Sequence, residues 1–384
     1  MSDTRKQLTF LDGLRGLAAL YVLVGHARWL LWEGFADGYR VHPERYSALG
    51  KSLVYALSAF RWGHEAVLFF FVLSGFVIHL RYATGLKRDP HYRLEFASYL
   101  ARRARRLYPP MLVALLLTWA LDRAGIRLQL PTALHTTSYP LINANVGSDH
   151  SITTLLRNLV FVMYPVFGSD GPLWSLNYEW YFYLLYPLVL MIDRRSIAAA
   201  SLVMVALSAV GYASIWPDAL LWFRGVCQLM IVWWLGALLA ERFARRLSVR
   251  YQDLAWLMLA PMALRVAPWI APWRDLLMGV AFCGLIAACL GLQERGWTLS
   301  SLARLRPLGE MSYTLYVIHF PILVFMSGCL MKRNGGALPE HFGAVGLGIG
   351  FALLVAWALH FVTERPFLPR GERAAPKVPA GAPS

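Results

Sequence analysis

The sequence predicts an all-α polytopic integral membrane protein, a helical bundle with about ten transmembrane helices and both termini in the cytoplasm. Of its 384 residues, 58% are apolar and only 15% are charged, and the mean hydropathy is +0.47. Because soluble domains carry about 25% charged residues, this composition excludes an ordinary soluble protein. The apolar residues suffice for about ten segments of the roughly 20 residues that a membrane-spanning helix needs.

Ten apolar segments can be placed along the chain. They cover about residues 14–32, 62–82, 107–122, 174–192, 196–215, 222–240, 254–270, 275–292, 312–331 and 342–362. Several contain Gly, Pro or ionisable residues, which lipid permits only where neighbouring helices or water satisfy the freed polar groups. We expect residues 1–370 to form the membrane domain. Residues 371–384 are low in complexity and are expected to form a disordered cytoplasmic tail.

The distribution of positive charge gives this bundle an orientation. With a cytoplasmic N-terminus, the inside segments hold roughly twice as many Lys and Arg residues as the outside segments, as the positive-inside rule requires. The net charge of +15 is therefore mostly topological, and with no RNA or DNA motif beside it we expect no nucleic-acid partner. The inside cluster Arg102, Arg103, Arg105 and Arg106 is denser than topology requires.

Two long outside connections and four cysteines complete this organisation. The connections, about residues 33–61 and 123–173, are expected to cover the outer mouth of the bundle with short helices near 50–60 and 152–166. Cys227, Cys283, Cys289 and Cys329 all lie in apolar stretches without metal-like spacing, which favours core packing.

Ionisable residues inside the predicted spans are candidates for function, because each costs at least about 2.5 kcal/mol in the bilayer. His26 follows Arg15 by eleven residues, about 16 Å along a helix, so both point the same way and are expected on one wall of a common cavity. Taken alone, Arg15 is equally consistent with a snorkelling anchor and His26 with a helix-packing residue.

Two further segments carry polar groups at membrane depth. Glu179 is expected to be paired, most simply with a histidine, while Ser175 and Asn177 would bind a polar substrate or cap a helix. Tyr316 and His319 are three residues apart and therefore share a helix face. His79 and His360 are interpreted as packing or boundary residues, and no metal site is expected.

Together these segments resemble the membrane acyltransferase-3 family from residue 10 to residue 366. The segment from Phe10 to Ala19, with ten residues between Arg15 and His26, is similar to the family's Arg-x10-His motif. The run from Phe69 to Phe76 resembles its second-span signature. The family's RxxR element matches either Arg102 with Arg105 or Arg103 with Arg106, before Tyr108 and Pro109. The remaining matches are Leu173 to Glu179 with Phe182 and Tyr183, Ser312 to His319, and Glu364 to Pro366.

The resemblance implies an O-acyltransferase of the bacterial inner membrane. Such an enzyme moves an acyl group, usually acetyl from acetyl-CoA as co-substrate, to a hydroxyl of a cell-surface polysaccharide, lipid-linked saccharide or glycoside. Arg15 and the cluster Arg102, Arg103, Arg105 and Arg106 would hold the phosphates of acyl-CoA through guanidinium forks. His26 would act as the general base, or instead as a transient acyl carrier.

The other site residues have secondary roles under this interpretation. Glu179 would orient the imidazole or bind the acceptor, and His319 with Tyr316 would polarise the thioester or assist the leaving thiolate. Trp180 stands where many members carry a second acidic residue, which weakens any role that needs two carboxylates. No SGNH-type hydrolase domain follows in this sequence, so the membrane domain is expected to complete transfer alone.

Two other function classes remain open at this stage. A polar-solute transporter also places His, Glu and Arg residues inside the membrane. It gives no reason for four arginines at one cytoplasmic rim. A scaffold or sensor would bind acyl-CoA without turnover.

Overall fold

The computed structural model describes residues 8–213, 215–244, 247, 249–261, 270 and 273–367, and every regular element among them is helical. The long helices are α2 (Thr9–Leu31), α4 (Gly63–Arg88), α5 (Phe96–Arg127), α8 (Trp174–Asp193), α9 (Ile197–Tyr212), α10 (Leu221–Phe243), α13 (Arg274–Glu294), α16 (Ser312–Arg333) and α17 (Gly343–Thr363). The short ones are α3 (Ala48–Ser58), α6 (Pro140–Asn145), α7 (Ile152–Leu159), α11 (Tyr251–Ala255), α14 (Ser300–Arg304) and α15 (Arg306–Glu310). Single turns of tighter or wider helix are η1 (Phe35–Tyr39), η2 (Pro43–Arg45), η3 (Gly171–Leu173), η4 (Asp218–Leu220), η5 (Trp256–Leu259) and η7 (Arg365–Phe367).

Among the described residues, seven helices are long and apolar enough to cross a bilayer, which confirms a multi-pass helical membrane protein. These are α2, α4, α5, α10, α13, α16 and α17, the last counted through Phe367. At about 1.5 Å per residue, even the 21-residue α13 reaches about the 30 Å of the hydrocarbon core. The apolar α9 is shorter, and the expected span at 254–270 falls partly outside the described residues. The count of ten spans and the side of the termini stay predictions, and the expected tail at 371–384 also lies outside the described residues.

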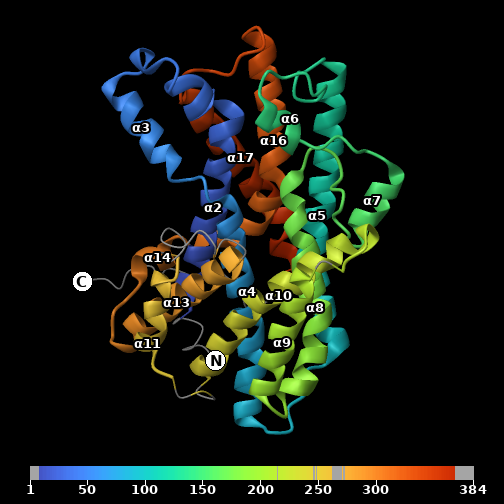
Figure 1. Cartoon of the computed structure of the whole chain (residues 1–384), viewed down its shortest axis with the longest axis vertical. Helices are drawn as coiled ribbons and strands as arrows, with labels where there is room; N and C mark the ends of the chain where they lie inside the picture. Colours follow the sequence, from blue (N-terminus) through green and yellow to red (C-terminus); the bar gives the residue numbers. More distant parts are fainter. Residues whose placement is uncertain are drawn as a thin grey trace, which may run out of the picture.

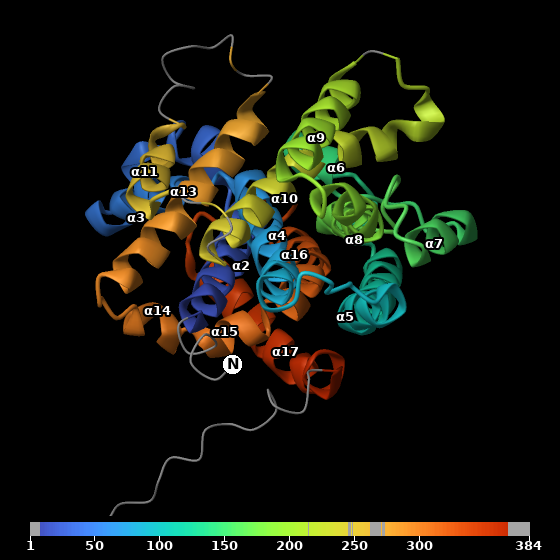
Figure 2. The same cartoon turned by 90° about the horizontal axis from the view of Figure 1, so that it is seen from below.

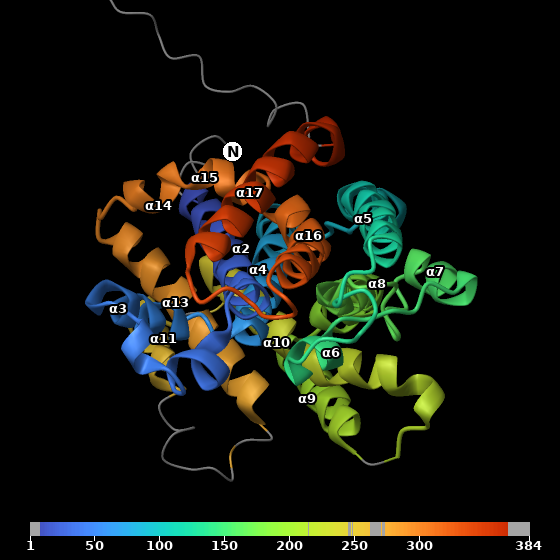
Figure 3. The ribbon, with the colours of Figure 1, turned by 90° about the horizontal axis from the view of Figure 1, so that it is seen from above.

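The helices form a bundle with α2, α4 and α16 in the middle (Figure 1). Figure 2 and Figure 3, from below and above, place α5, α8 and α9 to one side of this core and α13 with α14 to the other. The turn between α4 and α5 lies at the bottom of Figure 1, and Lys87, Arg88 and the Arg102–Arg106 cluster flank it. We call this end of the bundle the basic end.

Glycine permits a close crossing of α4 and α10. A Cβ atom on Gly75 of α4 would lie 1.9 Å from the Trp233 carbonyl oxygen of α10, and one on Gly236 would lie 1.9 Å from the Val72 carbonyl oxygen. Because no side chain fits there, α4 and α10 pack backbone against backbone, and their neighbouring side chains are held in fixed positions.

The two long connections contain the short helices that the sequence predicts. Helix α3 confirms the expected helix near 50–60, and α7 confirms the second one but ends earlier, at Leu159. Serine caps both: the hydroxyl of Ser47 accepts from the Gly50 amide at 3.1 Å, and that of Ser151 accepts from the Thr154 amide at 3.2 Å.

The cysteines follow the prediction with one exception. Cys227, Cys283 and Cys289 are buried in the core, whereas Cys329 on α16 is exposed, and all four are free.

Candidate active site

A pocket lies between α2, α4, α5, α8 and α16, beside the basic end, with about 730 Å³ of empty space that includes its opening to solvent. One wall is apolar and comes mainly from α4. The polar residues that line it are Arg15, Ser74, Arg103, Arg106, Ser175, Glu179, Tyr183, Ser312, Tyr313 and Tyr316. The pocket therefore gathers candidate residues from four separate parts of the sequence: Arg15, the arginine cluster, the segment of Ser175 and Glu179, and the segment of Tyr316.

Arg15 is fixed at the start of this pocket. Its Nη2 atom contacts Asp12 Oδ1 at 2.5 Å, one turn earlier on α2, and its Nε–H donates to the Gly309 carbonyl at 3.3 Å. Its side chain is 19% exposed, so it is not an anchor that reaches freely into solvent. The guanidinium is oriented before any ligand binds.

The arginine cluster divides into two pairs. Arg103 and Arg106, three residues apart on one face of α5, line the pocket, while Arg102 and Arg105 do not. Within the described residues no carboxylate lies in ion-pair distance of Arg103 or Arg106, so both are available to an anion. Of the two frames in which the RxxR element can be read, the structure brings only Arg103 and Arg106 to Arg15. Arg102 and Arg105 lie outside the lining of the pocket, so a part for them in donor binding stays a prediction.

Glu179 also lines the pocket, and its partner is a tyrosine. The hydroxyl of Tyr183, one turn later on α8, donates to the Glu179 carboxylate, and it also lies 3.3 Å from Ser74 Oγ on α4. The pairing of Glu179 with a histidine, expected from the sequence, is therefore wrong. An i,i+4 tyrosine satisfies the carboxylate without a residue from another helix.

Beyond the pocket, His26 and His319 form a hydrogen-bonded pair. His26 Nδ1 lies 2.8 Å from His319 Nε2, and the two rings stack with centroids 5.1 Å apart. His319 Nδ1 lies 3.0 Å from the Leu315 carbonyl oxygen, which can only accept. The Nδ1 atom of His319 must then carry the proton, so its Nε2 accepts a hydrogen bond from Nδ1–H of His26.

This chain of hydrogen bonds fixes where the free lone pair lies. When His26 is neutral and protonated at Nδ1, its Nε2 atom is the basic nitrogen. No described group hydrogen-bonds to that atom. His319, buried and 1% exposed, thus orients His26 through the tautomer that the Leu315 carbonyl imposes.

The histidine pair adjoins the pocket without lining it. Arg15 lines the pocket but His26 does not, so the expectation of one common wall is wrong for His26. The side chain between the two sites is that of Tyr316, whose ring centroid is 6.0 Å from that of His319. The Tyr316 hydroxyl lies 2.8 Å from Ser175 Oγ and 3.1 Å from the Pro172 carbonyl oxygen.

Asn177 lies outside this arrangement. Its side-chain amide donates to the Trp222 carbonyl at 3.2 Å, which ties α8 to the start of α10. The structure thus gives Asn177 a packing contact and does not place it at the pocket.

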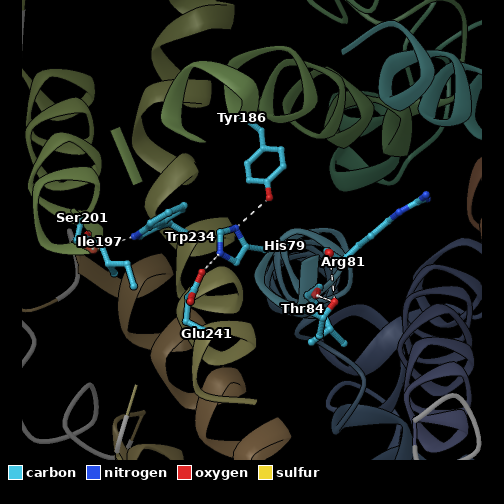
Figure 4. A network of polar contacts seen from close by, with 9 residues as sticks. His79, Arg81, Thr84, Tyr186, Ile197, Ser201, Trp234 and Glu241 are labelled. Atoms are coloured by element: carbon cyan, nitrogen blue, oxygen red, sulfur yellow. Dashed lines mark hydrogen bonds and ion pairs between the residues drawn. The ribbon is translucent and has the colours of Figure 1, made fainter. Parts of the chain in front are cut away.

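Sequence reasoning missed a second buried polar cluster, shown in Figure 4. His79 Nε2 lies 2.5 Å from Glu241 Oε1, its Nδ1 lies 2.9 Å from the Tyr186 hydroxyl, and all three side chains are buried. Asp193 lies close to this cluster, because its carboxylate and the ligand atoms of His79 and Glu241 all lie within 4.8 Å of one another. Among the described residues, these three form the one group whose residue types could hold a metal ion. The sequence carries one sign of this cluster, which is the carboxylate of Glu241 directly after the apolar run of α10.

A second hollow, with about 1310 Å³ of empty space that includes its opening to solvent, lies against the start of α2. Among the described residues that line it, Glu294 is the one charged side chain, in contrast to the arginines of the first pocket.

Comparison with known proteins assigns the family. The structure so far defines a helical membrane protein in which an arginine-lined pocket lies next to a hydrogen-bonded pair of histidines. A family model described as an acyltransferase domain matches residues 8–361. The chain therefore belongs to the acyltransferase-3 family, a family of acyltransferase enzymes.

Three curated relatives support this assignment. A protein of Bacillus subtilis (strain 168), provisionally named peptidoglycan O-acetyltransferase YrhL, is 25% identical over 95% of this chain and 55% of its own length. Nodulation protein 10 of Rhizobium leguminosarum bv. viciae is 30% identical over 52% of this chain and 48% of its own length. Acyltransferase MdmB of Streptomyces mycarofaciens is 25% identical over 94% of this chain and 91% of its own length.

The chain spans about half the length of the first two of these relatives. No solved structure matches the chain. The family and its relatives lend no support to the transporter hypothesis.

Proposed function

We propose that this protein is an integral membrane O-acyltransferase that moves an acyl group, preferably acetyl, from cytosolic acyl-CoA to a hydroxyl of a cell-surface polysaccharide, lipid-linked saccharide or glycoside. The observation that carries the proposal is the contiguity of the arginine-lined pocket and the oriented base of His26 in a chain of this family. The names of two relatives, an O-acetyltransferase and an acyltransferase, agree with it.

The donor binds in the arginine-lined pocket. Arg15, Arg103 and Arg106 offer guanidinium forks to the phosphates of CoA, the best-matched ligands for such groups. The excess of positive charge at the basic end favours a cytoplasmic position for this mouth, with both termini cytoplasmic and the protein in the bacterial inner membrane. The apolar wall from α4 would then receive the pantetheine arm and the acyl group.

His26 removes the proton from the acceptor hydroxyl. The alkoxide oxygen bonds to the thioester carbonyl carbon, the C–S bond breaks, and the leaving CoA thiolate takes a proton back. General-base assistance of this kind contributes roughly 10²–10⁴ in rate. His319 steadies the imidazolium by accepting from Nδ1–H of His26. The lone pair on Nε2 would serve equally for the second route, in which His26 attacks the thioester and carries the acyl group as an acyl-imidazole.

Glu179 and Ser175 set the polarity of the pocket. The Glu179 carboxylate, held by Tyr183, offsets part of the arginine charge, which would ease release of CoA. Ser175 acts through its hydrogen bond to Tyr316.

The test is transfer of radiolabelled acetyl from acetyl-CoA to glycan or lipid in membranes that contain the protein. We expect transfer with the wild-type chain and none with His26→Ala, while His341→Ala, which removes an exposed histidine, retains it. Unaltered transfer in His26→Ala contradicts the role of His26. Mass spectrometry of surface glycans from cells with and without the gene then identifies the acceptor by the loss of an acetyl group.

A rapid acid quench of the enzyme with acetyl-CoA, without acceptor, separates the two routes. An acetyl group on the peptide that contains His26 supports the acyl-imidazole, and its absence during steady turnover supports direct transfer.

A further inference from the structure

The partition between the pocket and the histidine pair is built from three helices. Phe70 of α4, Ser175 of α8 and Tyr316 of α16 all line the pocket. The Tyr316 ring contacts Phe70 and His319, with its centroid 6.0 Å from that of each. Tyr316 is buried, lines the pocket and contacts His319, so its side chain adjoins both sites.

We propose that Tyr316 is a gate that separates the donor pocket from the His26–His319 pair, opens to admit the thioester, and restricts passage to short acyl groups. This inference rests on the proposed function, because it assumes that the acyl donor lies in the arginine-lined pocket. It assigns Tyr316 a task distinct from contact with the reacting atoms.

The closed position is held by a latch of three polar groups. The Tyr316 hydroxyl, the Ser175 hydroxyl and the Pro172 carbonyl lie within 2.8 to 3.3 Å of one another. Whichever hydroxyl donates to the carbonyl, the other donates to its neighbour, so the groups satisfy one another. The closed state therefore needs no ligand to stabilise it.

The helix that carries the gate has a weak point directly after it. Pro321 lies inside α16 and has no N–H, so the Val317 carbonyl one turn earlier lacks its usual helical donor. Local bending of the turn between Tyr316 and Pro321 is thereby less costly than elsewhere in the helix. Movement of Tyr316 can then be local, while the rest of α16 stays packed.

A closed gate keeps the bound thioester apart from His26 and from any water that reaches this half-buried base. If water reached the bound thioester beside His26, its oxygen would bond to the acyl carbon, the C–S bond would break, and free acid and CoA thiol would result. A gate that opens only briefly therefore protects the donor from hydrolysis. The aromatic ring also limits the length of acyl chain that can pass.

Tyr316→Phe tests the latch, since it keeps the ring and removes the hydroxyl. We measure release of CoA thiol from acetyl-CoA by the purified protein without acceptor. Loss of one net hydrogen bond corresponds to about a tenfold change, so we expect hydrolysis to rise about tenfold. Ser175→Ala, which breaks the same latch from the other side, should raise it similarly.

Tyr108→Phe is the matched control, because the Tyr108 hydroxyl donates to the Leu159 carbonyl outside the pocket. The double variant His26→Ala/Tyr316→Phe should show no raised hydrolysis, since the leak passes through His26. Hydrolysis by Tyr316→Phe equal to that of Tyr108→Phe overturns the gate. So does a fall in transfer without any leak, because Tyr316 would then act on the reacting atoms.

Chain-length preference gives a second measurement. Tyr316→Ala should raise turnover of butyryl-CoA and octanoyl-CoA relative to acetyl-CoA, whereas an unchanged ratio contradicts the gate. If Tyr316→Ala does not fold, the same ratio is measured for Ser175→Ala. Failure of the proposed function is distinct from all of these results: the wild-type protein would then neither bind acetyl-CoA nor release CoA from it.

Discussion

Two histidines on the long helices of this molecule, His79 and His26, have opposite hydrogen-bonding patterns. His79 uses both ring nitrogens, one toward Glu241 and one toward Tyr186. His26 uses one nitrogen, toward His319, and leaves Nε2 to any arriving group. A histidine with both nitrogens engaged ties helices together, whereas one with a single engaged nitrogen keeps a lone pair for proton transfer. The comparison predicts that the first stabilises the fold and the second serves the reaction.

The largest effect should follow from loss of His26 and of the free lone pair on its Nε2 atom. His26→Ala is expected to lower acyl transfer by roughly 10²–10⁴-fold, because it removes the general base. Its midpoint of thermal unfolding should stay near the wild-type value, since His26 is only half-buried. Parallel assays of transfer and unfolding on the same preparation check this. If His26→Ala loses stability along with activity, the distinction between a reactive His26 and a structural His79 is contradicted.

Loss of His79, whose two ring nitrogens are both hydrogen-bonded, should lower stability more than activity. His79→Leu removes the imidazole that contacts the buried Glu241 carboxyl group, and loss of a partner from a buried polar group costs about 1–3 kcal/mol. Thermal unfolding in detergent should show a clear drop in midpoint, while the protein that remains folded at low temperature retains transfer activity. Wild-type stability with lost transfer would place His79 in the chemistry instead.

The arginine pairs sharpen the assignment of the pocket. Arg106→Gln should raise the KM for acyl-CoA by about tenfold or more, as expected for loss of a charge-assisted hydrogen bond, and should weaken its salt dependence. Arg105→Gln, which changes an exposed arginine one residue away, is the matched control and should leave KM unchanged. Equal effects of both variants would mean that the cluster acts only through its overall charge.

A third histidine, His150, extends the comparison to the long connection between α5 and α8. Its Nε2 contacts Asp122 Oδ2 at 2.8 Å and its Nδ1 contacts the Ser148 carbonyl oxygen at 2.9 Å, so both nitrogens are engaged. The hydrogen bond that His150 donates to the Asp122 carboxylate raises the pKa of His150 above its ordinary value, with burial opposing the shift.

Because the folded-state pKa of His150 is raised, the stabilisation should be fully present below about pH 6.5 and should be lost as pH rises through the raised pKa. The pair is partly exposed, so we expect an effect below about 1 kcal/mol. Thermal unfolding of wild type and His150→Gln across this range measures it. The two proteins should differ at low pH and converge at high pH, and a constant difference would contradict the prediction.

The sequence predicts the helical membrane fold and most of the candidate site residues, because intramembrane charges are rare enough to be noticed. It does not predict their partners. His319 is 293 residues from His26, and Glu241 is 162 residues from His79, so spacing carries no information about either contact. The RxxR pattern occurs in two overlapping frames, and only the rotation of α5 about its axis selects Arg103 and Arg106. Glu179 found a local tyrosine because one lay a turn away on the same helix.

The glycine crossing of α4 and α10 limits how this enzyme can diversify. Ser74, next to Gly75, accepts from Trp233 Nε1 at 3.3 Å and contacts the Tyr183 that holds Glu179. A bulkier residue at Gly75 or Gly236 would push apart the backbones that align this set, so this side of the pocket tolerates little mutation. Evolved or engineered changes in donor preference should therefore accumulate on α5 and α16, where side chains can change size while the glycine crossing stays intact.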